Sequence, residues 1–236
     1  MKPRIKPGVV RDYKNVEPIT FAKLDEDTQN RVDRIAEEFK NGFTLIKSAE
    51  LAVTFWGSAR IPMSDPMYLK AERLAGRIAK ELGHTIVTGG GPGIMAAGNC
   101  GAYDNGGKSI GLTIKLPHEQ KTNLCLTHHM DFQYFFARKV CLAFAAEAYV
   151  YFPGGFGTLD ELFEVLTLVQ TKKIEPQPSI ILVGKKYWKG LDKFIRKTLA
   201  KQGMIDKEDL DLYTITDDEE KIMEMIKNSS ARKSKI

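Results

Sequence analysis

A glycine-rich segment in the second half of the chain carries the residues best suited to chemistry. Residues 153–161 read PGGFGTLDE, after an apolar run over residues 143–152 and before a helical pattern. A strand, a glycine turn and a helix N-terminus in series form an anion site, because backbone N–H groups and the helix dipole meet there. Gly154, Gly155 and Gly157 leave room for a close ligand. The segment therefore predicts a phosphate site.

Thr158 and Glu161 allow two interpretations of this segment. Their spacing fits a capping box, in which Thr158 caps the helix and Glu161 reaches back to its N–H, and spacing alone favours this one. In the other interpretation, the Thr158 hydroxyl donates to a phosphate. The Glu161 carboxylate, which a phosphate repels, then faces another part of the ligand.

Two further turns rich in Gly or Ser also end predicted strands. One contains Gly57 and Ser58, and the other, residues 89–93, contains Gly90 and Gly91. Neither has the G-x-G-x-x-G spacing of a dinucleotide site, and neither runs into Gly-Lys-Ser/Thr, so we expect neither NAD nor the usual ATPase. Glycine turns at neighbouring strand ends instead suit a phosphorylated small molecule such as a mononucleotide.

Arg138 and Lys139 are adjacent cations in an otherwise apolar helix predicted over residues 132–146. In one interpretation they form a surface pair whose stems lie along the edge of the core. In the other, Arg138 turns into the site, where its planar guanidinium grips a phosphate or ribose oxygen. The sequence leaves both open.

The cysteines and histidines give no sign of a metal or a disulfide. Cys100, Cys125 and Cys141 form no C-x-x-C pair and no even set, which argues against a disulfide framework or a zinc site. We expect Cys100 and Cys141 to pack as small apolar groups, and a reducing cytoplasm is the simplest compartment. His128 and His129 lack a third ligand at a suitable spacing, so we predict no metal.

Size and composition predict a soluble globular protein. The 236 residues are 43% hydrophobic and 28% charged, enough for one large domain with a full core. We expect no signal peptide and no membrane span, because the chain has neither an apolar segment behind its N-terminus nor an apolar run of spanning length. The formal charge of +5 gathers at the two ends without a nucleic-acid motif, so we expect no nucleic-acid partner.

Hydrophobic periodicity supplies the elements that position these residues. Residues 1–20 read as an extended arm, and residues 25–47 as a helix with an apolar stripe made of Leu24, Val32, Ile35, Phe39, Phe43 and Ile46. Strands are then predicted over residues 51–56, 84–88, 108–116, 124–130, 148–152, 179–183 and 212–215. Helices are predicted over residues 66–82, 94–103, 132–146, 159–171, 188–202 and 217–226.

This alternation predicts an α/β fold, a Rossmann-like parallel sheet with helices on both faces, plus an N-terminal helical extension. We divide the chain into an arm and helix over residues 1–47, one nucleotide-binding domain over residues 48–227, and a basic tail over residues 228–236. In such sheets ligands bind at the carboxyl ends of the strands, where all three glycine or serine turns fall.

The motifs together resemble the LOG (Lonely Guy) family of cytokinin riboside 5′-monophosphate phosphoribohydrolases, often labelled "lysine decarboxylase-like". The family pattern PGGxGTxxE is matched in full, with Arg138-Lys139 upstream, and the resemblance covers about residues 50–200. It implies a Rossmann-like dimer or larger assembly. It also implies hydrolysis of the N-glycosidic bond of a nucleoside 5′-monophosphate, with Arg138 and Glu161 as the catalytic residues. The three residues before Arg138, Phe-Phe-Ala, depart from the Met-His-x of plant members.

We therefore predict a hydrolase that acts on AMP or a cytokinin riboside monophosphate and needs no cofactor. Glu161 would stabilise the cationic sugar and activate water, while Arg138 positions the ligand. The predicted binding residues are Ser58, Gly90, Gly91, Lys139, Gly154, Gly155, Gly157 and Thr158. A non-catalytic nucleotide-sensing or carrier module is the main alternative, and a structural subunit is a third. A pyridoxal phosphate decarboxylase would need a lysine in a matching context, which we do not find. We also expect a homodimer or a multiple of it.

Overall fold

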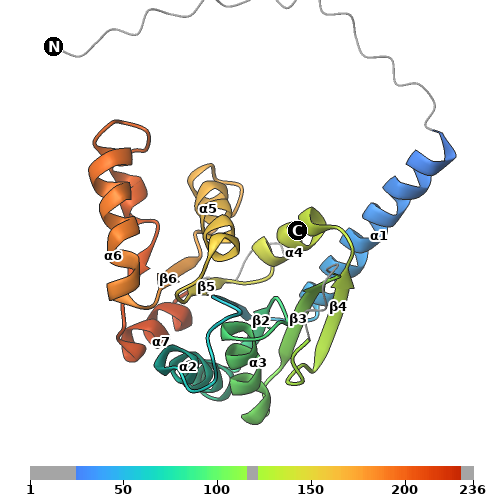
Figure 1. Cartoon of the computed structure of the whole chain (residues 1–236), viewed down its shortest axis with the longest axis horizontal. Helices are drawn as coiled ribbons and strands as arrows, with labels where there is room; N and C mark the ends of the chain where they lie inside the picture. Colours follow the sequence, from blue (N-terminus) through green and yellow to red (C-terminus); the bar gives the residue numbers. More distant parts are fainter. Residues whose placement is uncertain (1–24, 116–121, 230–236) are drawn as a thin grey trace, which may run out of the picture. The chain divides into compact units, whose positions relative to one another are not determined.

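The computed structural model describes residues 25–115 and 122–229 (Figure 1). The chain divides into two compact units, Met1–Arg34 and Ile35–Ile236, and the division falls inside the first helix, α1 (Glu26–Lys47). This helix confirms the one predicted over residues 25–47. The arm over residues 1–20, Leu24 of the apolar stripe and nearly all of the basic tail lie outside the described residues. The predicted boundary between residues 47 and 48 stays a prediction.

A single parallel sheet organises the described part of the unit Ile35–Ile236. Its strands are β1 (Ala52–Trp56), β2 (Thr85–Thr88), β3 (Ser109–Ile114), β4 (His128–Phe132), β5 (Ala148–Tyr151), β6 (Ser179–Leu182) and β7 (Thr214–Ile215). They lie in the order β4-β3-β2-β1-β5-β6-β7, and every pairing is parallel. The chain moves outward from β1 to β4 and then returns beside β1, so the topological switch point lies between β1 and β5.

Helices cover both faces of this sheet, which confirms the predicted Rossmann-like α/β fold. They are α2 (Pro66–Leu82), α3 (Ile94–Asp104), α4 (Phe135–Ala143), α5 (Phe156–Gln170), α6 (Lys185–Phe194) and α7 (Glu219–Lys227). Figure 1 shows α4 and α5 on one side of the strands and α2 and α3 on the other. A hydrophobic core lies on each face of the sheet, and alternate residues of β1 point into one or the other. Trp56 packs toward α4 and α5, and Phe55 packs toward α2 and α3. Within residues 25–115 and 122–229, no helix is both long and apolar enough to cross a membrane.

Local sequence explains where several elements begin and end. The helix predicted over residues 66–82 is confirmed as α2: Asp65 accepts a hydrogen bond from the N–H of Met67, and Gly83 ends the helix with a φ of 69°. The helix predicted over residues 188–202 begins three residues earlier, as α6, and continues as a π-helical segment, Ile195–Ala200. Strand β4 begins four residues later than predicted.

The second half of α1 holds α4 in place. Glu38 Oε1 accepts a hydrogen bond from the N–H of Gln133 at 2.7 Å, and its Oε2 accepts one from Tyr134 at 3.1 Å, so α1 supplies a carboxylate to the N-terminus of α4. A Cβ at Gly42 would lie 2.6 Å from the sulfur of Cys141, which only glycine avoids. Ile46 is buried in the core of its own chain, and Phe39 and Phe43 pack against that core while staying partly exposed.

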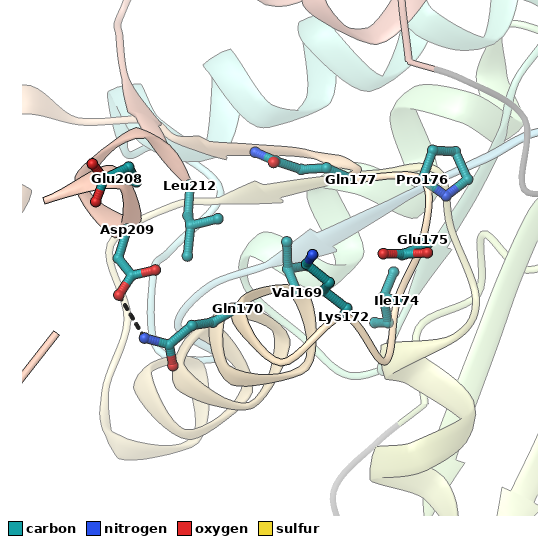
Figure 2. A pocket seen from close by; sticks show the side chains of 10 residues that line it. All are labelled: Val169, Gln170, Lys172, Ile174, Glu175, Pro176, Gln177, Glu208, Asp209 and Leu212. Atoms are coloured by element: carbon teal, nitrogen blue, oxygen red, sulfur yellow. Dashed lines mark hydrogen bonds between the residues drawn. The ribbon is translucent and has the colours of Figure 1, made fainter. Parts of the chain in front are cut away.

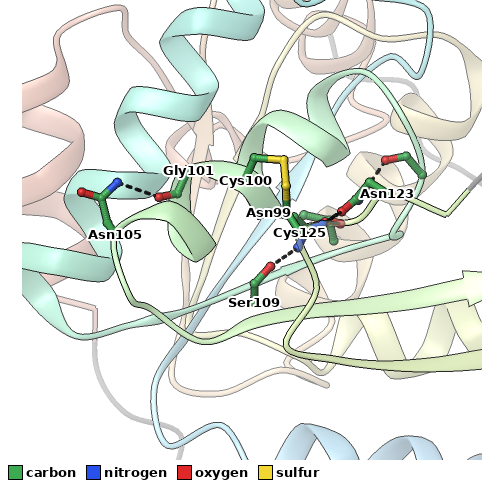
Figure 3. Close-up of a disulfide and its surroundings, with 9 residues drawn as sticks. Asn99, Cys100, Gly101, Asn105, Ser109, Asn123 and Cys125 are labelled. Atoms are coloured by element: carbon green, nitrogen blue, oxygen red, sulfur yellow. Dashed lines mark hydrogen bonds between the residues drawn. A yellow bond between two sulfur atoms is a disulfide. The ribbon is translucent and has the colours of Figure 1, made fainter.

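A disulfide corrects the expectation drawn from the scattered cysteines. Cys100 on α3 and Cys125 before β4 are bonded, with their Cα atoms 4.8 Å apart (Figure 3). The two are 25 residues apart in sequence, and pairing of β3 between β2 and β4 brings them together. Sequence spacing does not reveal such a pair. Cys141 is buried and free, and the cysteines no longer argue for a reducing compartment.

Candidate active site

A cavity of about 770 Å³ lies at the switch point, where β1 and β5 end. The end of β1 and the turn after it contribute residues 56–60 to its lining, and the turn after β5 with the start of α5 contributes residues 154–159 and Glu161. Phe135 and Arg138 come from α4, and Met95, Ile114 and Tyr187 complete the lining. Both the volume and the position are those expected of a small-molecule site in a parallel sheet.

The three glycine or serine turns meet at this edge of the sheet. The N–H of Ser58 donates to the carbonyl of Pro153 at 3.0 Å, and the N–H of Ile94 donates to the carbonyl of Ser58 at 3.1 Å. The turn after β1 is therefore bonded both to the PGGFG turn and to the start of α3. A Cβ at Gly93 would collide with the backbone of Ser58 and Ala59, so glycine permits this close approach.

Helix α5 begins earlier than its capping-box spacing predicts, and that interpretation is wrong. The first helical residue is Phe156, and Gly155 is the N-cap, without a side-chain cap. Thr158 is the third residue of the helix and Glu161 lies in its second turn, so neither caps it. Because the first N–H groups of a helix have no intrahelical partner, the start of α5 can bind an anion. A Cβ added at Gly155 or Gly157 would meet nothing within 4 Å, which leaves open space for that anion.

Thr158 is fixed beside the glycine turn. Its side chain is buried, and a Cβ at Gly154 would collide with its hydroxyl oxygen. Glycine is therefore required at position 154 if Thr158 is to keep this place at the floor of the cavity.

Glu161 is the buried carboxyl group of the cavity. Only 4% of the residue is exposed, and its Oε2 has no hydrogen-bond partner among the described residues. Burial raises the pKa of Glu161 to about 8, and the Glu164 carboxylate adds to this, while Lys139 and Arg138 oppose it. The group therefore changes its protonation state just above neutral pH.

Arg138 turns inward, which decides between the two interpretations left open by the sequence. The residue is 9% exposed and lines the cavity. Its Nε donates to the carbonyl of Leu112 at 2.6 Å and its Nη2 to the carbonyl of Gly89 at 3.4 Å. Burial lowers its pKa, opposed by the charge of Glu161, yet a guanidinium stays protonated at neutral pH. Arg138 thus places a fixed positive charge in the same cavity as Glu161.

The cavity unites seven of the ten residues predicted for the site. It brings together Ser58, Arg138, Gly154, Gly155, Gly157, Thr158 and Glu161. Lys139 points elsewhere and donates to Asp160 Oδ2 at 2.7 Å. Gly90 and Gly91 line a separate hollow of about 30 Å³ beside Thr113 and Asp131.

Three of the lining residues that sequence reasoning missed carry polar groups. Arg60 follows the turn after β1, and its position behind Gly57-Ser58 was a signal that could have been used. Trp56 is a core residue that also borders the cavity, and its Nε1 is buried without a hydrogen-bond partner in the described part of the chain. Tyr187, whose hydroxyl donates to the carbonyl of Gly154, comes from α6 and had no signal in sequence.

A second cavity, of about 620 Å³, lies at the far end of α5, near Val169 and Gln170 (Figure 2). Gln170 Nε2 donates to Asp209 Oδ2 at 2.6 Å across it. Its lining holds no glycine turn and carries three carboxyl groups, Glu175, Glu208 and Asp209, against one cation, Lys172, so it suits an anion poorly. Among residues 25–115 and 122–229, no cluster of three or more His, Cys, Asp or Glu side chains could hold a metal ion.

A family model described as "Possible lysine decarboxylase" matches residues 95–226, more than half of the chain. The chain belongs to this family. It is the LOG family that the PGGxGTxxE motif indicated, so the resemblance is confirmed. A relative from Rhodococcoides fascians, named cytokinin riboside 5′-monophosphate phosphoribohydrolase, is 29% identical over 142 residues. The match spans 57% of this chain and 68% of that protein.

Solved structures of other proteins share the fold of this family member. A molybdenum cofactor carrier protein from Chlamydomonas reinhardtii superposes with a TM-score of 0.58 at 19% identity, over 75% of this chain and 96% of that one. A molybdenum cofactor binding protein from Rippkaea orientalis gives a TM-score of 0.52 at 20% identity, over 75% of this chain and 94% of that one. At these identities the likeness concerns the fold alone.

Proposed function

We propose that the protein hydrolyses the N-glycosidic bond of a nucleoside 5′-monophosphate, such as AMP or a cytokinin riboside monophosphate, to the free base and ribose 5-phosphate. The observation that carries this proposal is the single cavity in which buried Glu161 and Arg138 accompany the open N-terminus of α5. The named activity of the Rhodococcoides fascians relative agrees with it.

The 5′-phosphate would bind at the start of α5. Gly155 and Gly157 border open space, the helix dipole favours a negative charge, and the Thr158 hydroxyl lies beside Gly154. Arg60 also lines the cavity and adds a second positive charge to it. This arrangement explains why a carboxyl group can share the site: the phosphate occupies the helix end, and Glu161 lies one turn further along.

Glu161 would then face the anomeric carbon of the ribose. As the C1′–N bond breaks, its electron pair goes to the base and the sugar becomes oxocarbenium-like. An ionised Glu161 stabilises this cation and accepts one proton from the water that attacks C1′, and that proton is then delivered to the departing base. The raised pKa of Glu161 makes it a stronger base than an exposed glutamate.

The cavity fits the other candidate activities less well. Pyridoxal phosphate chemistry uses a lysine as a Schiff base, and no lysine lines this cavity. A carrier or sensing module would bind the ligand without breaking it. A buried carboxyl group beside an anion site weakens anion binding, so its presence favours catalysis over carriage.

A direct assay separates these alternatives. Purified protein is incubated with AMP, prenylated AMP and other nucleoside 5′-monophosphates, and free base is measured by chromatography. We expect base release that Glu161→Gln abolishes while nucleotide binding persists. Binding without release by the parent protein would instead establish the carrier module, and a release rate unchanged by Glu161→Gln would refute the role of this residue.

We also propose that the protein forms a homodimer or a multiple of it. Large aromatic side chains remain exposed on the helices that border the cavity: Phe135 and Phe136 on α4, and Phe156 and Phe163 on α5. Phe156 is 92% exposed. Exposed aromatic side chains on helices that border a binding site are typical of a contact surface, and a symmetric pair of chains would cover them.

A further inference from the structure

A second carboxyl group lies behind Glu161 and takes no part in the cavity. Glu164 is one turn further along α5, and residues at this spacing share a helix face with their Cβ atoms about 5–6 Å apart. Its Oε2 is buried and accepts no hydrogen bond from the described residues. Because Glu164 does not line the cavity, it does not touch a ligand bound there.

Lys139 is the only side chain with which Glu164 forms an ion pair in the described part of the chain. Lys139 Nζ lies 3.6 Å from Glu164 Oε2, beyond hydrogen-bond distance, and instead donates to Asp160 Oδ2 at 2.7 Å. The Asp160 side chain is 53% exposed, whereas that of Glu164 is 23% exposed. The Lys139 ammonium group therefore lies closer to the more exposed carboxylate, that of Asp160, and neutralises the charge of Glu164 only in part.

We propose that Glu164 is a positioning residue for the reaction: its poorly compensated negative charge, behind the cavity, holds Glu161 ready to accept a proton, and Lys139 limits the effect. Two carboxylates on one helix face cannot both ionise freely in a buried setting, so a charge on Glu164 makes a second charge on Glu161 costly. Glu164 acts through Glu161 and not on the substrate.

The charged and titratable groups around Glu161 agree with this assignment. They are Asp160 and Glu164 on α5, Arg138 and Lys139 on α4, and Tyr151 on β5, whose hydroxyl donates to the Glu161 carbonyl at 3.3 Å. After burial itself, Glu164 has the largest influence on the pKa of Glu161, ahead of both cations and of Asp160. Tyr151 is fully buried and its pKa is raised well above its usual value, so it stays neutral throughout.

The test is a titration of the Glu161 carboxyl group by carbon-13 NMR, assigned through the signal that Glu161→Gln removes. We expect Glu164→Gln to lower its midpoint by about one pH unit, from charges about 6 Å apart at an effective dielectric constant of about 20 with partial screening. Lys139→Met should raise it. Asp160→Asn is the matched control, because it removes a more exposed carboxylate from the same turn and should shift the midpoint less.

A midpoint unchanged in Glu164→Gln, or moved as far by Asp160→Asn, would overturn the proposal. Should Glu164→Gln fail to fold, Lys139→Met remains decisive, since a downward shift of the midpoint or none contradicts the assignment.

The catalytic role of Glu164 rests on the proposed function, whereas its effect on the Glu161 titration does not, because the NMR experiment needs no turnover. If base is released, the alkaline rise of kcat/KM in Glu164→Gln should move down with the NMR midpoint, while Glu164→Asp, which keeps the charge, should restore the parent profile. If no base is released and the midpoints still move as expected, the proposed function fails while the coupling stands.

Discussion

Replacing Glu161 by glutamine should stabilise the folded protein at alkaline pH while it abolishes base release. The pKa of Glu161 is raised from its usual 4.5 to about 8 by burial, so the folded protein holds a proton that the unfolded chain releases. The free energy of unfolding is therefore highest below the unfolded pKa and falls as the pH rises through the folded pKa. Glutamine carries no charge at any pH and escapes this loss.

The magnitude follows from the size of the shift. One pKa unit corresponds to about 1.36 kcal/mol, so the rise of the pKa from 4.5 to about 8 costs on the order of 5 kcal/mol once the pH exceeds about 8. At about pH 5 the same residue costs only about 1 kcal/mol, because this pH is barely above the pKa of Glu161 in the unfolded chain. Glu161→Gln should thus gain a few kcal/mol relative to the parent between about pH 5 and pH 8.

Urea unfolding followed by circular dichroism at these two pH values measures the difference. Asp160→Asn, which removes the neighbouring but half-exposed carboxylate, should show little change in relative stability between them. If the stability difference between Glu161→Gln and the parent is the same at both pH values, Glu161 is not the buried, proton-holding group described above. That result would also remove the reason to regard it as a strong base.

Four further expectations concern the site and the assembly. Nucleoside 5′-monophosphates should be cleaved and the matching nucleosides should not, so equal rates on AMP and adenosine would contradict a phosphate site at α5. The value of kcat/KM should rise with pH through about 8 and then level, because the ionised form of Glu161 is the base; a flat profile would argue against that role. Gly154→Ala should weaken nucleotide binding about tenfold or more by displacing Thr158, whereas Gly190→Ala meets open space away from the cavity and should not; calorimetry compares the two, and equal affinities would contradict the packing argument. Light scattering should report a multiple of the 26.5 kDa chain, and Phe136→Ser should reduce it; a monomer that still releases base needs no partner.

Much of the fold was readable because the strands are buried and follow one another in a regular alternation. The sequence located α2 to the residue, since Asp65, Pro66 and Gly83 mark its two ends by local chemistry. The start of α5 was missed because Thr158 and Glu161 mimic a capping box, while Gly155 provides the N-cap without any side chain.

The candidate site was only partly visible in sequence. Its glycine turn and its buried charges lie in motifs, so Arg138 and Glu161 could be named before their geometry was known. Tyr187 and the Cys100–Cys125 bond depend on contacts between distant elements, which no local pattern encodes. The Lys139 side chain points to whichever carboxylate lies nearer, Asp160 or Glu164, and the sequence does not tell which one that is.

The disulfide between Cys100 and Cys125 acts on the unfolded chain as much as on the folded one. It closes a loop across a sequence separation of 25 residues, and the chain-entropy relation puts its effect at about 3.5 kcal/mol. In the folded chain, the segment that it ties down also carries Asn123, whose N–H and side chain donate to the carbonyls of Gly90 and Gly91 at 2.9 and 3.1 Å. In oxidising surroundings the disulfide is closed, and the unfolded chain has already lost part of the conformational entropy of this turn. In reducing surroundings the bond opens, and the turn must lose that entropy when the chain folds.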